Sequence, residues 1–225
     1  MSDASCDLLR NGFSEPLPRA FYARSATIVA PELLNCILVS ASPDGLTAGR
    51  VVETEAYTQD DAASHCFRGR TPRNRVMFGT AGHAYVYFTY GMHYCLNAVT
   101  GTEGQGEAVL IRAIEPLMGT ELMFSRRGLS VERLPIEKRS ATRAKRLLGA
   151  GPAVLCRSLG ISASHNGADL TEPGSLWICA VDVENEFASG GGLTVVTTTR
   201  IGITKAVELK RRFLIAADPY ISRKI

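Results

Sequence analysis

Two glutamates, Glu53 and Glu55, lie in the β-forming run 51–57. Because side chains alternate between the two faces of a strand, Glu53, Glu55 and Tyr57 are predicted to share one face. Strand interiors disfavour glutamate, so this pair calls for an explanation. Burial raises the pKa of a carboxyl group, which makes it an effective general base near neutral pH. The alternative is that both glutamates pair with arginines at a sheet edge, and the strand alone leaves both interpretations open.

An arginine-rich loop follows this strand. Residues 68–75 read RGRTPRNR and contain no acidic residue. The four basic side chains are Arg68, Arg70, Arg73 and Arg75. Guanidinium groups hold phosphates through forked N–H donors, so this loop is a candidate contact to a nucleic-acid backbone. A solvated loop with ordinary ion pairs is the alternative.

A dense aromatic run, YVYFTY, occupies residues 85–90. On a strand, Tyr85 and Tyr87 face one way, and Phe88 and Tyr90 face the other. Most aromatic strands are simply core, but Tyr90 precedes Gly91 at the tip of a predicted hairpin. A ring that projects from such a tip, beside basic loops, can wedge into a base stack and fill the gap left by a displaced nucleotide.

These motifs resemble the alkyladenine (3-methyladenine) DNA glycosylase family. The matching segments are 53–57, 63–65, 71–74, 85–87 and 90–92, followed by Asn97, 109–113, 115–117, 151–152 and 155–156. They keep the family's order and separations from about Phe21 to about Phe213. The chain departs from the family at Val154, where Lys or Arg is common, and at Thr199, where Pro is usual. These departures leave the DNA contacts of the C-terminal part open.

The resemblance implies an enzyme of base excision repair that needs no metal or cofactor. Such an enzyme flips a damaged purine out of double-stranded DNA and hydrolyses its N-glycosidic bond. Glu55 is then the general base that activates water, and Arg112 helps to position this water and a nearby phosphate. The implied base pocket consists of Tyr57, His65, Tyr87 and Asn97, with Asn97 screening against the amino group of guanine. The implied DNA contacts are the wedge Tyr90, Met92, and the arginines Arg70, Arg73 and Arg75.

Three other functions compete with this one. Glu53 and Glu55 could be the acid and base of a carbohydrate glycosidase, which needs roughly 5 to 9.5 Å between carboxyl groups. However, Trp177 is the only tryptophan available to stack on sugars. The second is a nucleic-acid-binding module without catalysis. The third is a zinc site made by His65, Cys66, His93 and Cys95, whose spacings fit no standard ligand pattern.

The elements that must position these residues indicate an α+β fold. Strands are predicted over 36–40, 46–57, 84–90, 94–100, 107–115, 176–181, 193–199 and around 213–215. A helix is predicted over 26–34 with Ser25 as N-cap, an ordered loop over 58–82, and helical, basic structure over 117–160. We expect a single mixed domain, 18–225, with a central curved antiparallel β-sheet flanked by helices and a β-hairpin that projects into DNA. Residues 1–17 are expected to be a flexible lead-in.

Composition narrows the class of protein. Of the 225 residues, 45% are hydrophobic and 21% charged, which is typical of a globular chain. No apolar run approaches the roughly 18 residues of a membrane span, and residues 1–11 do not resemble a secretory signal. We therefore expect an intracellular monomer, in the cytoplasm or nucleoid of a bacterium or the nucleus of a eukaryote. Six cysteines without a C-x-x-C pair are expected to be buried thiols.

The charge is only mildly basic, at +3 with a pI near 8.6, so its distribution matters more than its sum. Beyond the arginine loop, a second basic zone lies around 138–146. If this zone is helical, Arg139, Arg143 and Arg146 form one stripe. A charged stripe is more often a wet face than a binding site, so it only supports the interpretation above.

Overall fold

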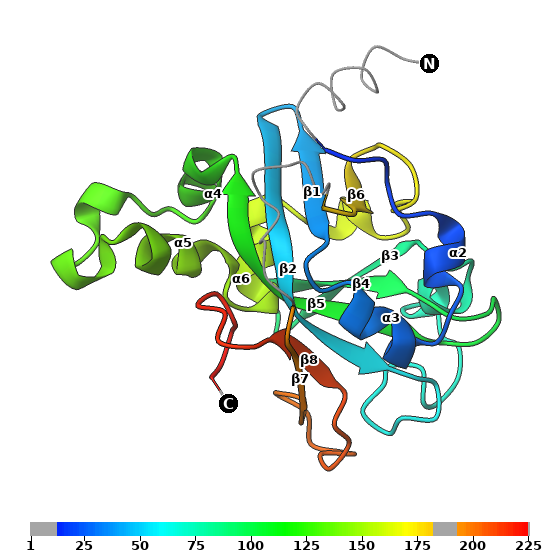
Figure 1. The fold of residues 1–225 in the computed structure, drawn as a ribbon. Helices are drawn as coiled ribbons and strands as arrows, with labels where there is room; N and C mark the ends of the chain where they lie inside the picture. The colour runs from blue at the N-terminus through cyan, green and yellow to red at the C-terminus, as the bar shows by residue number, and fades with distance from the viewer. Residues whose placement is uncertain (1–12, 182–192, 225) are drawn as a thin grey trace.

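The longest strand of the molecule lies at the centre of its sheet (Figure 1). The computed structural model describes residues 13–181 and 193–224, and within them eight strands pair antiparallel. Six follow the order β3-β4-β5-β2-β1-β6, while β8 pairs with β2 and with β7. The strands are β1 Ile37–Ser42, β2 Gly45–Tyr57, β3 Ala84–Thr89, β4 His93–Val99, β5 Ala108–Met118, β6 Leu176–Cys179, β7 Val195–Thr198 and β8 Arg212–Ile215. The α+β class and the antiparallel sheet are confirmed.

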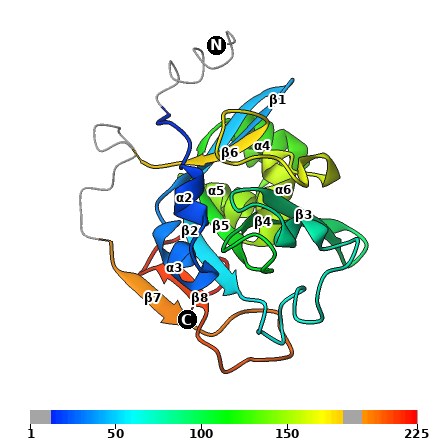
Figure 2. The ribbon, with the colours of Figure 1, turned by 90° about the vertical axis from the view of Figure 1, so that its right-hand side faces the viewer.

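The helices flank this sheet (Figures 1 and 2). They are α2 Arg19–Tyr22, α3 Ala26–Glu32, α4 Thr120–Arg126, α5 Ala141–Gly149 and α6 Pro152–Leu159, with 3₁₀ turns η1 Arg75–Phe78, η2 Val131–Arg133, η3 Ile136–Lys138 and η4 Ala163–His165. Helices α5 and α6 pack on β4 and β5, and α3 packs on β2. The main core fills the space between these helices and the sheet.

Strand β2 has three partners because it is long enough to change neighbours along its length. Along one side, residues 45–50 of β2 pair with β1 and residues 53–55 pair with β8. Strand β5 pairs with β2 along the other side. The register to β5 shifts on both sides of Glu53. Such bulges re-aim side chains and often lie next to functional sites. Strand β2 therefore carries both glutamates through the middle of the sheet, and the alternative placement at a sheet edge is wrong.

The segment 117–160 is less helical than predicted. Strand β5 continues to Met118, and residues 127–140 contain only the turns η2 and η3 between α4 and α5. Gly128, at φ 65°, and Pro135 interrupt the helical pattern. Arg139 consequently lies before α5 and folds back onto the carbonyl groups of Glu132 and Leu134. The predicted continuous arginine stripe does not form.

Helix α3 begins where predicted, but a different group caps it. Ser25 occupies the N-cap position without a capping hydrogen bond from its side chain. Instead, the carboxylate of Glu107 accepts hydrogen bonds from the Ala26 N–H at 2.7 Å and from the Ser25 hydroxyl at 3.0 Å. A carboxylate at a helix N-terminus satisfies a free N–H and complements the helix dipole. This cap is a long-range contact that a local sequence pattern does not show.

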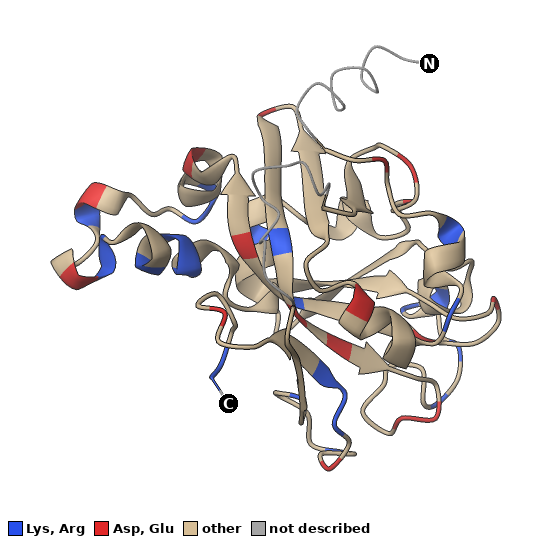
Figure 3. Ribbon diagram, viewed as in Figure 1, with Lys and Arg blue, Asp and Glu red and all other residues tan. Residues whose placement is uncertain are grey.

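Charged residues are rare along the strands, so those on β2 stand out in the centre of the sheet (Figure 3). Arg50 is one of them, and it bridges the carboxylates of Glu115, at 2.6 Å, and Asp218, at 2.8 Å. Burial makes such charges costly unless they are paired. These ion pairs tie the C-terminal segment across β2 and β5.

The expected lead-in, 1–17, lies outside the described residues for positions 1–12. Of the remainder, Phe13 is buried and the Leu17 N–H donates to the carbonyl of Ile178 at 2.8 Å. The five cysteines among the described residues are free thiols, and all are buried. No helix in the described ranges is long and apolar enough to cross a membrane.

Candidate active site

A cavity of about 510 Å³ opens at one end of the sheet. It is bounded by the C-terminal end of β2, strands β3 to β5, the arginine-containing loop 58–82 and the loop between β7 and β8. Its lining includes seven of the predicted site residues: Tyr57, His65, Arg73, Tyr87, Tyr90, Asn97 and Arg112. Glu55, Arg70, Arg75 and Met92 are not part of the lining.

Glu55 lies directly beneath the floor of this cavity, with no exposed surface. Its Oε2 accepts a hydrogen bond from the Tyr57 hydroxyl at 2.8 Å, and its Oε1 accepts one from the Ile201 N–H at 2.8 Å. Arg112 Nη1 lies 3.3 Å from Oε1. All three of these neighbours line the cavity. Burial raises the pKa of Glu55, and the Arg112 charge and the two hydrogen bonds oppose this rise without cancelling it.

Glu53 is also fully buried, but its surroundings differ. Its Oε1 pairs with Arg112 Nε at 2.9 Å and with Arg212 Nε at 2.7 Å, and Ser222 donates to both carboxylate oxygens. Burial opposes ionisation here too, but the Ser222 N–H and the two arginines outweigh it and lower the pKa of Glu53. A carboxyl group held ionised in this way is no general acid. Because Glu53 is also absent from the cavity lining, this arrangement disfavours the carbohydrate-glycosidase alternative, which needs both carboxyl groups at the substrate.

The walls of the cavity are aromatic. The rings of His65 and Tyr87 meet edge to face with centroids 4.5 Å apart, and Tyr85 stacks on Tyr87 at 5.4 Å. His65 Nδ1 lies 3.1 Å from the Tyr85 hydroxyl. Burial, and secondarily the Arg73 charge, hold the pKa of His65 below its ordinary value, so the imidazole is neutral near pH 7. A flat ligand between these rings and Tyr57 would meet aromatic surfaces without meeting an imidazolium charge.

Asn97 lies on β4 at the back of the cavity. It is 5% exposed, and its Nδ2 donates to the carbonyl of Tyr85 at 3.2 Å. This hydrogen bond fixes the amide, so that its oxygen and nitrogen cannot exchange places freely. A fixed polar group in an aromatic pocket can discriminate between ligands by their edges.

The hairpin between β3 and β4 carries Tyr90 at its tip. Tyr90 is 83% exposed and Met92 is 68% exposed. Tyr90 and Gly91 have φ of 51° and 67°, and the Met92 N–H closes the turn onto the carbonyl of Thr89. Positive φ at both central residues is the pattern of a type I′ turn, in which a tyrosine is unusual. The turn therefore presents a large ring to solvent at a conformational cost.

The arginine loop is rigid at its centre and open at its rim. Asn74 is buried. Its Nδ2 donates to the carbonyls of His65 and Gly69, and its Oδ1 accepts a hydrogen bond from the Thr71 N–H. Around this anchor the four guanidinium groups are exposed, and none forms an ion pair within the described residues. Arg73 also donates to the carbonyl of Phe88 at 3.0 Å. In this part of the described chain, the loop thus lacks the ordinary ion pairs of the alternative interpretation.

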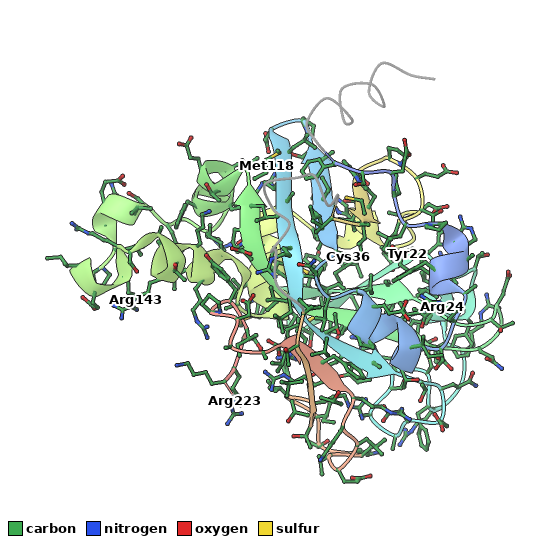
Figure 4. The ribbon with its side chains drawn as sticks, in the orientation of Figure 1. Tyr22, Arg24, Cys36, Met118, Arg143 and Arg223 are labelled. Carbon is green, nitrogen blue, oxygen red and sulfur yellow. The ribbon has the colours of Figure 1, made fainter. Side chains whose placement is uncertain are left out.

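The second basic zone lies elsewhere. Arg143 is on helix α5, away from β3 and β4 (Figures 1 and 4). Its Nη1 donates to the carbonyl of Glu137, and Arg146 donates to that of Pro219. These arginines hold local structure together rather than lining the cavity.

The sequence reasoning missed several residues of the site. Asn74 shapes the loop, Tyr85 binds His65, and Ile201 supplies a backbone donor to Glu55. The aromatic run contained Tyr85 on the correct face, so this residue was accessible to prediction. Ile201 was not, because its contribution is a backbone N–H. In 13–181 and 193–224, no three His, Cys, Asp or Glu side chains are grouped to hold a metal ion.

Fold and site together define a class: an enzyme whose aromatic slot lies over a buried carboxylate and opens beside an exposed arginine loop. The model of the methylpurine-DNA glycosylase family matches residues 20–219. The chain belongs to this family of DNA-repair enzymes, which hydrolyse N-glycosidic bonds.

Relatives from three organisms agree with this assignment. The chain is 47% identical over 208 residues to a protein of Carboxydothermus hydrogenoformans, covering 92% of this chain and 99% of that one. It is 47% identical to a protein of Methanoculleus marisnigri with the same coverage, and 39% identical over 216 residues to one of Agrobacterium fabrum, with 96% and 97% covered. Each bears the name "Putative 3-methyladenine DNA glycosylase". The similarity spans nearly all of each protein.

Proposed function

We propose that this protein excises alkylated purines from double-stranded DNA. The damaged nucleotide turns out of the helix into the aromatic cavity, and Glu55 activates the water that hydrolyses its N-glycosidic bond. The observation that carries the proposal is the position of Glu55 under the cavity floor, where it accepts hydrogen bonds from the lining residues Tyr57 and Ile201. Tyr57, His65 and Tyr87 then form the pocket, with Asn97 as the group that screens the guanine amino group.

The chemistry needs little more than this carboxylate. A purine alkylated at N3 or N7 is cationic and leaves as a neutral base. The water oxygen bonds to C1′, the bond from C1′ to the purine nitrogen breaks, and its electron pair leaves with the purine. Glu55 accepts the proton from water and, while ionised, stabilises the oxocarbenium-like sugar. Arg112 orients the carboxylate from the cavity side.

The proposal places the attacking water on Oε2 of Glu55. The carboxylate has no exposed surface, so water must enter among the groups that cover it. Each carboxylate oxygen has two lone pairs, and Oε2 accepts a single hydrogen bond within the described residues, from Tyr57. A water molecule that takes the second position on Oε2 is then directed toward the cavity.

The aromatic walls favour cationic bases. Electron-rich faces attract a cation within about 6 Å of the ring centroid, and the neutral His65 does not oppose it. A neutral lesion would need a proton to leave, and the ionised Glu53 cannot supply it. We therefore propose that charged alkylpurines are better substrates than neutral deaminated ones.

The exposed rim binds the DNA in this proposal. Tyr90, with Met92 beside it, enters the base stack as the nucleotide turns out, and Arg70, Arg73 and Arg75 contact phosphates. Flipping costs a few kcal/mol and costs least for damaged bases. One chain supplies the cavity, the carboxylate and the rim, which supports a monomer as the active form.

Release of free base from methylated double-stranded DNA, with EDTA present, tests the proposal. We expect Glu55→Gln to abolish release while binding to lesion-containing DNA survives. Glu121→Gln, on the exposed side of α4, is the matched control and should keep full activity. Full activity of Glu55→Gln would refute the mechanism. Binding to DNA without base release by the unaltered protein would instead favour the non-catalytic binding module.

A further inference from the structure

A buried ion pair lies directly behind the cavity wall. The side chains of Arg200 and Asp61 are both completely buried. Asp61 belongs to the loop that follows β2, whereas Arg200 begins the loop between β7 and β8, of which residues 201–205 line the cavity. Replacing a buried ion pair with apolar residues is often neutral or stabilising. Stability alone is therefore a weak reason for placing these two charges here.

The Arg200 guanidinium connects three segments of the chain. It donates to Asp61 Oδ1 at 3.0 Å, to the carbonyl of Ala56 on β2 at 3.2 Å and to the carbonyl of Ala206 at 3.4 Å. Ala206 has φ of 47°, a conformation that non-glycine residues rarely adopt. Arg200 therefore links the two ends of the segment 200–206, whose residues 201–205 line the cavity.

The same guanidinium covers the rear face of a cavity wall. Its Cζ lies 4.6 Å from the centroid of the Tyr57 ring. Its Nε is buried and has no hydrogen-bond partner within the described residues. The group is thus placed to stack on the ring at the expense of one hydrogen bond. A ring packed in this way has little freedom to turn.

Both groups that Arg200 fixes are donors to Glu55. The hydroxyl of Tyr57 binds Oε2, and the N–H of Ile201, the next residue in the chain, binds Oε1. Within the described residues, no hydrogen bond or ion pair joins Arg200 to the carboxylate itself. Arg200 therefore acts indirectly, through the two neighbours that donate hydrogen bonds to Glu55.

We infer that Arg200, held by Asp61, is the positioning residue of this site, which fixes the Tyr57 ring and the Ile201 N–H around Glu55. The kinetic consequences of this role rest on the proposed function. The effect of Arg200 on the pKa of Glu55 does not rest on the proposed function, because it follows from the hydrogen bonds alone.

The charged and titratable groups that face Glu55 come from several elements. They are Arg112 on β5, Tyr57 and Glu53 on β2, and Tyr87 on β3, together with the N–H of Ile201. Arg200 controls two of the three donors that oppose the effect of burial. Losing its hold should therefore raise the pKa of Glu55 further, because burial is then less opposed.

Two substitutions separate positioning from structural support. Arg200→Met removes the charge and the stacking group. Arg200→Lys keeps a charge for Asp61 but lacks the planar fork that stacks on Tyr57 and reaches the two carbonyls. Arg211→Met is the matched control, since Arg211 also pairs with Asp61, at 3.3 Å, but does not stack on Tyr57.

The first readout is a ¹³C NMR titration of the Glu55 carboxyl group, assigned with Glu55→Gln. We expect Arg200→Met and Arg200→Lys to raise its pKa and Arg211→Met to leave it near the wild-type value. This readout does not need glycosylase activity, so it separates failure of the inference from failure of the proposed function. An unchanged titration in the folded Arg200 variants, or an equal shift in Arg211→Met, would overturn the inference.

The second readout is the pH dependence of base release. The acid limb of kcat should move to higher pH with the Glu55 pKa, and kcat at neutral pH should fall about 10- to 100-fold, as expected for a misplaced catalytic group. KM for lesion-containing DNA should change much less. If Arg200→Met does not fold, Arg200→Lys decides the question. A loss of thermal stability with an unshifted pH profile would show purely structural support.

Discussion

Arg112 shows how one arginine can serve two carboxylates with different properties. Its Nε binds Glu53, which two arginines and Ser222 keep ionised, while its Nη1 faces Glu55, for which burial dominates. Environments that push the pKa values of neighbouring acids apart are a mark of acid–base sites. At the scale of single residues, the two glutamates of β2 thus divide into a structural anchor and a candidate base.

The raised pKa of Glu55 predicts an acid limb in the activity. The ionised carboxylate is the active form, so base release should fall as the pH decreases through its pKa, which lies above the value near 4.5 of an ordinary glutamate. A profile of kcat against pH with a cationic lesion checks this, because the leaving group then needs no proton. A profile that stays flat to pH 4 would contradict the assignment of Glu55.

Glu53 predicts an effect on stability rather than on chemistry alone. Glu53→Gln would leave Arg112 and Arg212 buried without full charge compensation, and breaking such pairs typically costs about 3–5 kcal/mol. Because the folded-state pKa is lowered, Glu53 stabilises the fold above its unfolded-state pKa, and this contribution is lost as the pH falls through the folded-state value.

Urea unfolding of the wild type and Glu53→Gln at neutral and acidic pH measures both effects. We expect a lower free energy of unfolding in the variant at pH 7 and a smaller difference at low pH. Glu121→Gln should unfold like the wild type. Equal stability of Glu53→Gln at pH 7 would show that the arginines find other partners.

At the scale of elements, the β3–β4 hairpin combines a strained turn with an exposed ring. Tyr90→Ala should weaken binding to lesion-containing DNA by about 1–3 kcal/mol, the usual contribution of a ring that stacks on a base. Turnover of lesions that are already captured should change less. Equilibrium binding and single-turnover kinetics separate the two effects. Phe67→Ala removes an exposed aromatic ring from outside the hairpin and serves as the control.

Elements that depend on local sequence patterns were predicted well, whereas features that depend on contacts between distant segments were not. Alternating patterns and turn residues predicted β2, β3 and β4 to within about a residue, since they are local signals. The Glu107 cap of α3 and the long extension of β5 depend on contacts between distant segments. The same limit applies to the site. Residue types made Glu55 and the tyrosines candidates, and the family resemblance assigned their expected roles, but the backbone donor at Ile201 and the stacking of Arg200 are visible only in three dimensions.

At the scale of the whole molecule, the net charge is only +3, but the basic side chains differ in what they contact. Around α5, arginines bind carbonyl groups of their own chain. In the loop 68–75 the guanidinium groups remain exposed next to the cavity mouth, with Arg73 in its lining. In the proposed mechanism, a flipped nucleotide would bring its flanking phosphates to this mouth. The free positive charge therefore lies where the proposed substrate would place negative charge.

This distribution predicts which arginines set the salt dependence of DNA binding. Removing one arginine that neutralises a phosphate should reduce the slope of log K against log salt by about 0.9, because fewer counterions are released. We expect Arg70→Gln and Arg75→Gln each to reduce the slope by up to this amount. Arg143→Gln should leave it unchanged, since Arg143, on the distant helix α5, donates to the carbonyl of Glu137. Fluorescence anisotropy over a range of salt concentrations measures the slopes. Wild-type slopes in both Arg70→Gln and Arg75→Gln would place the phosphate contacts outside the arginine loop.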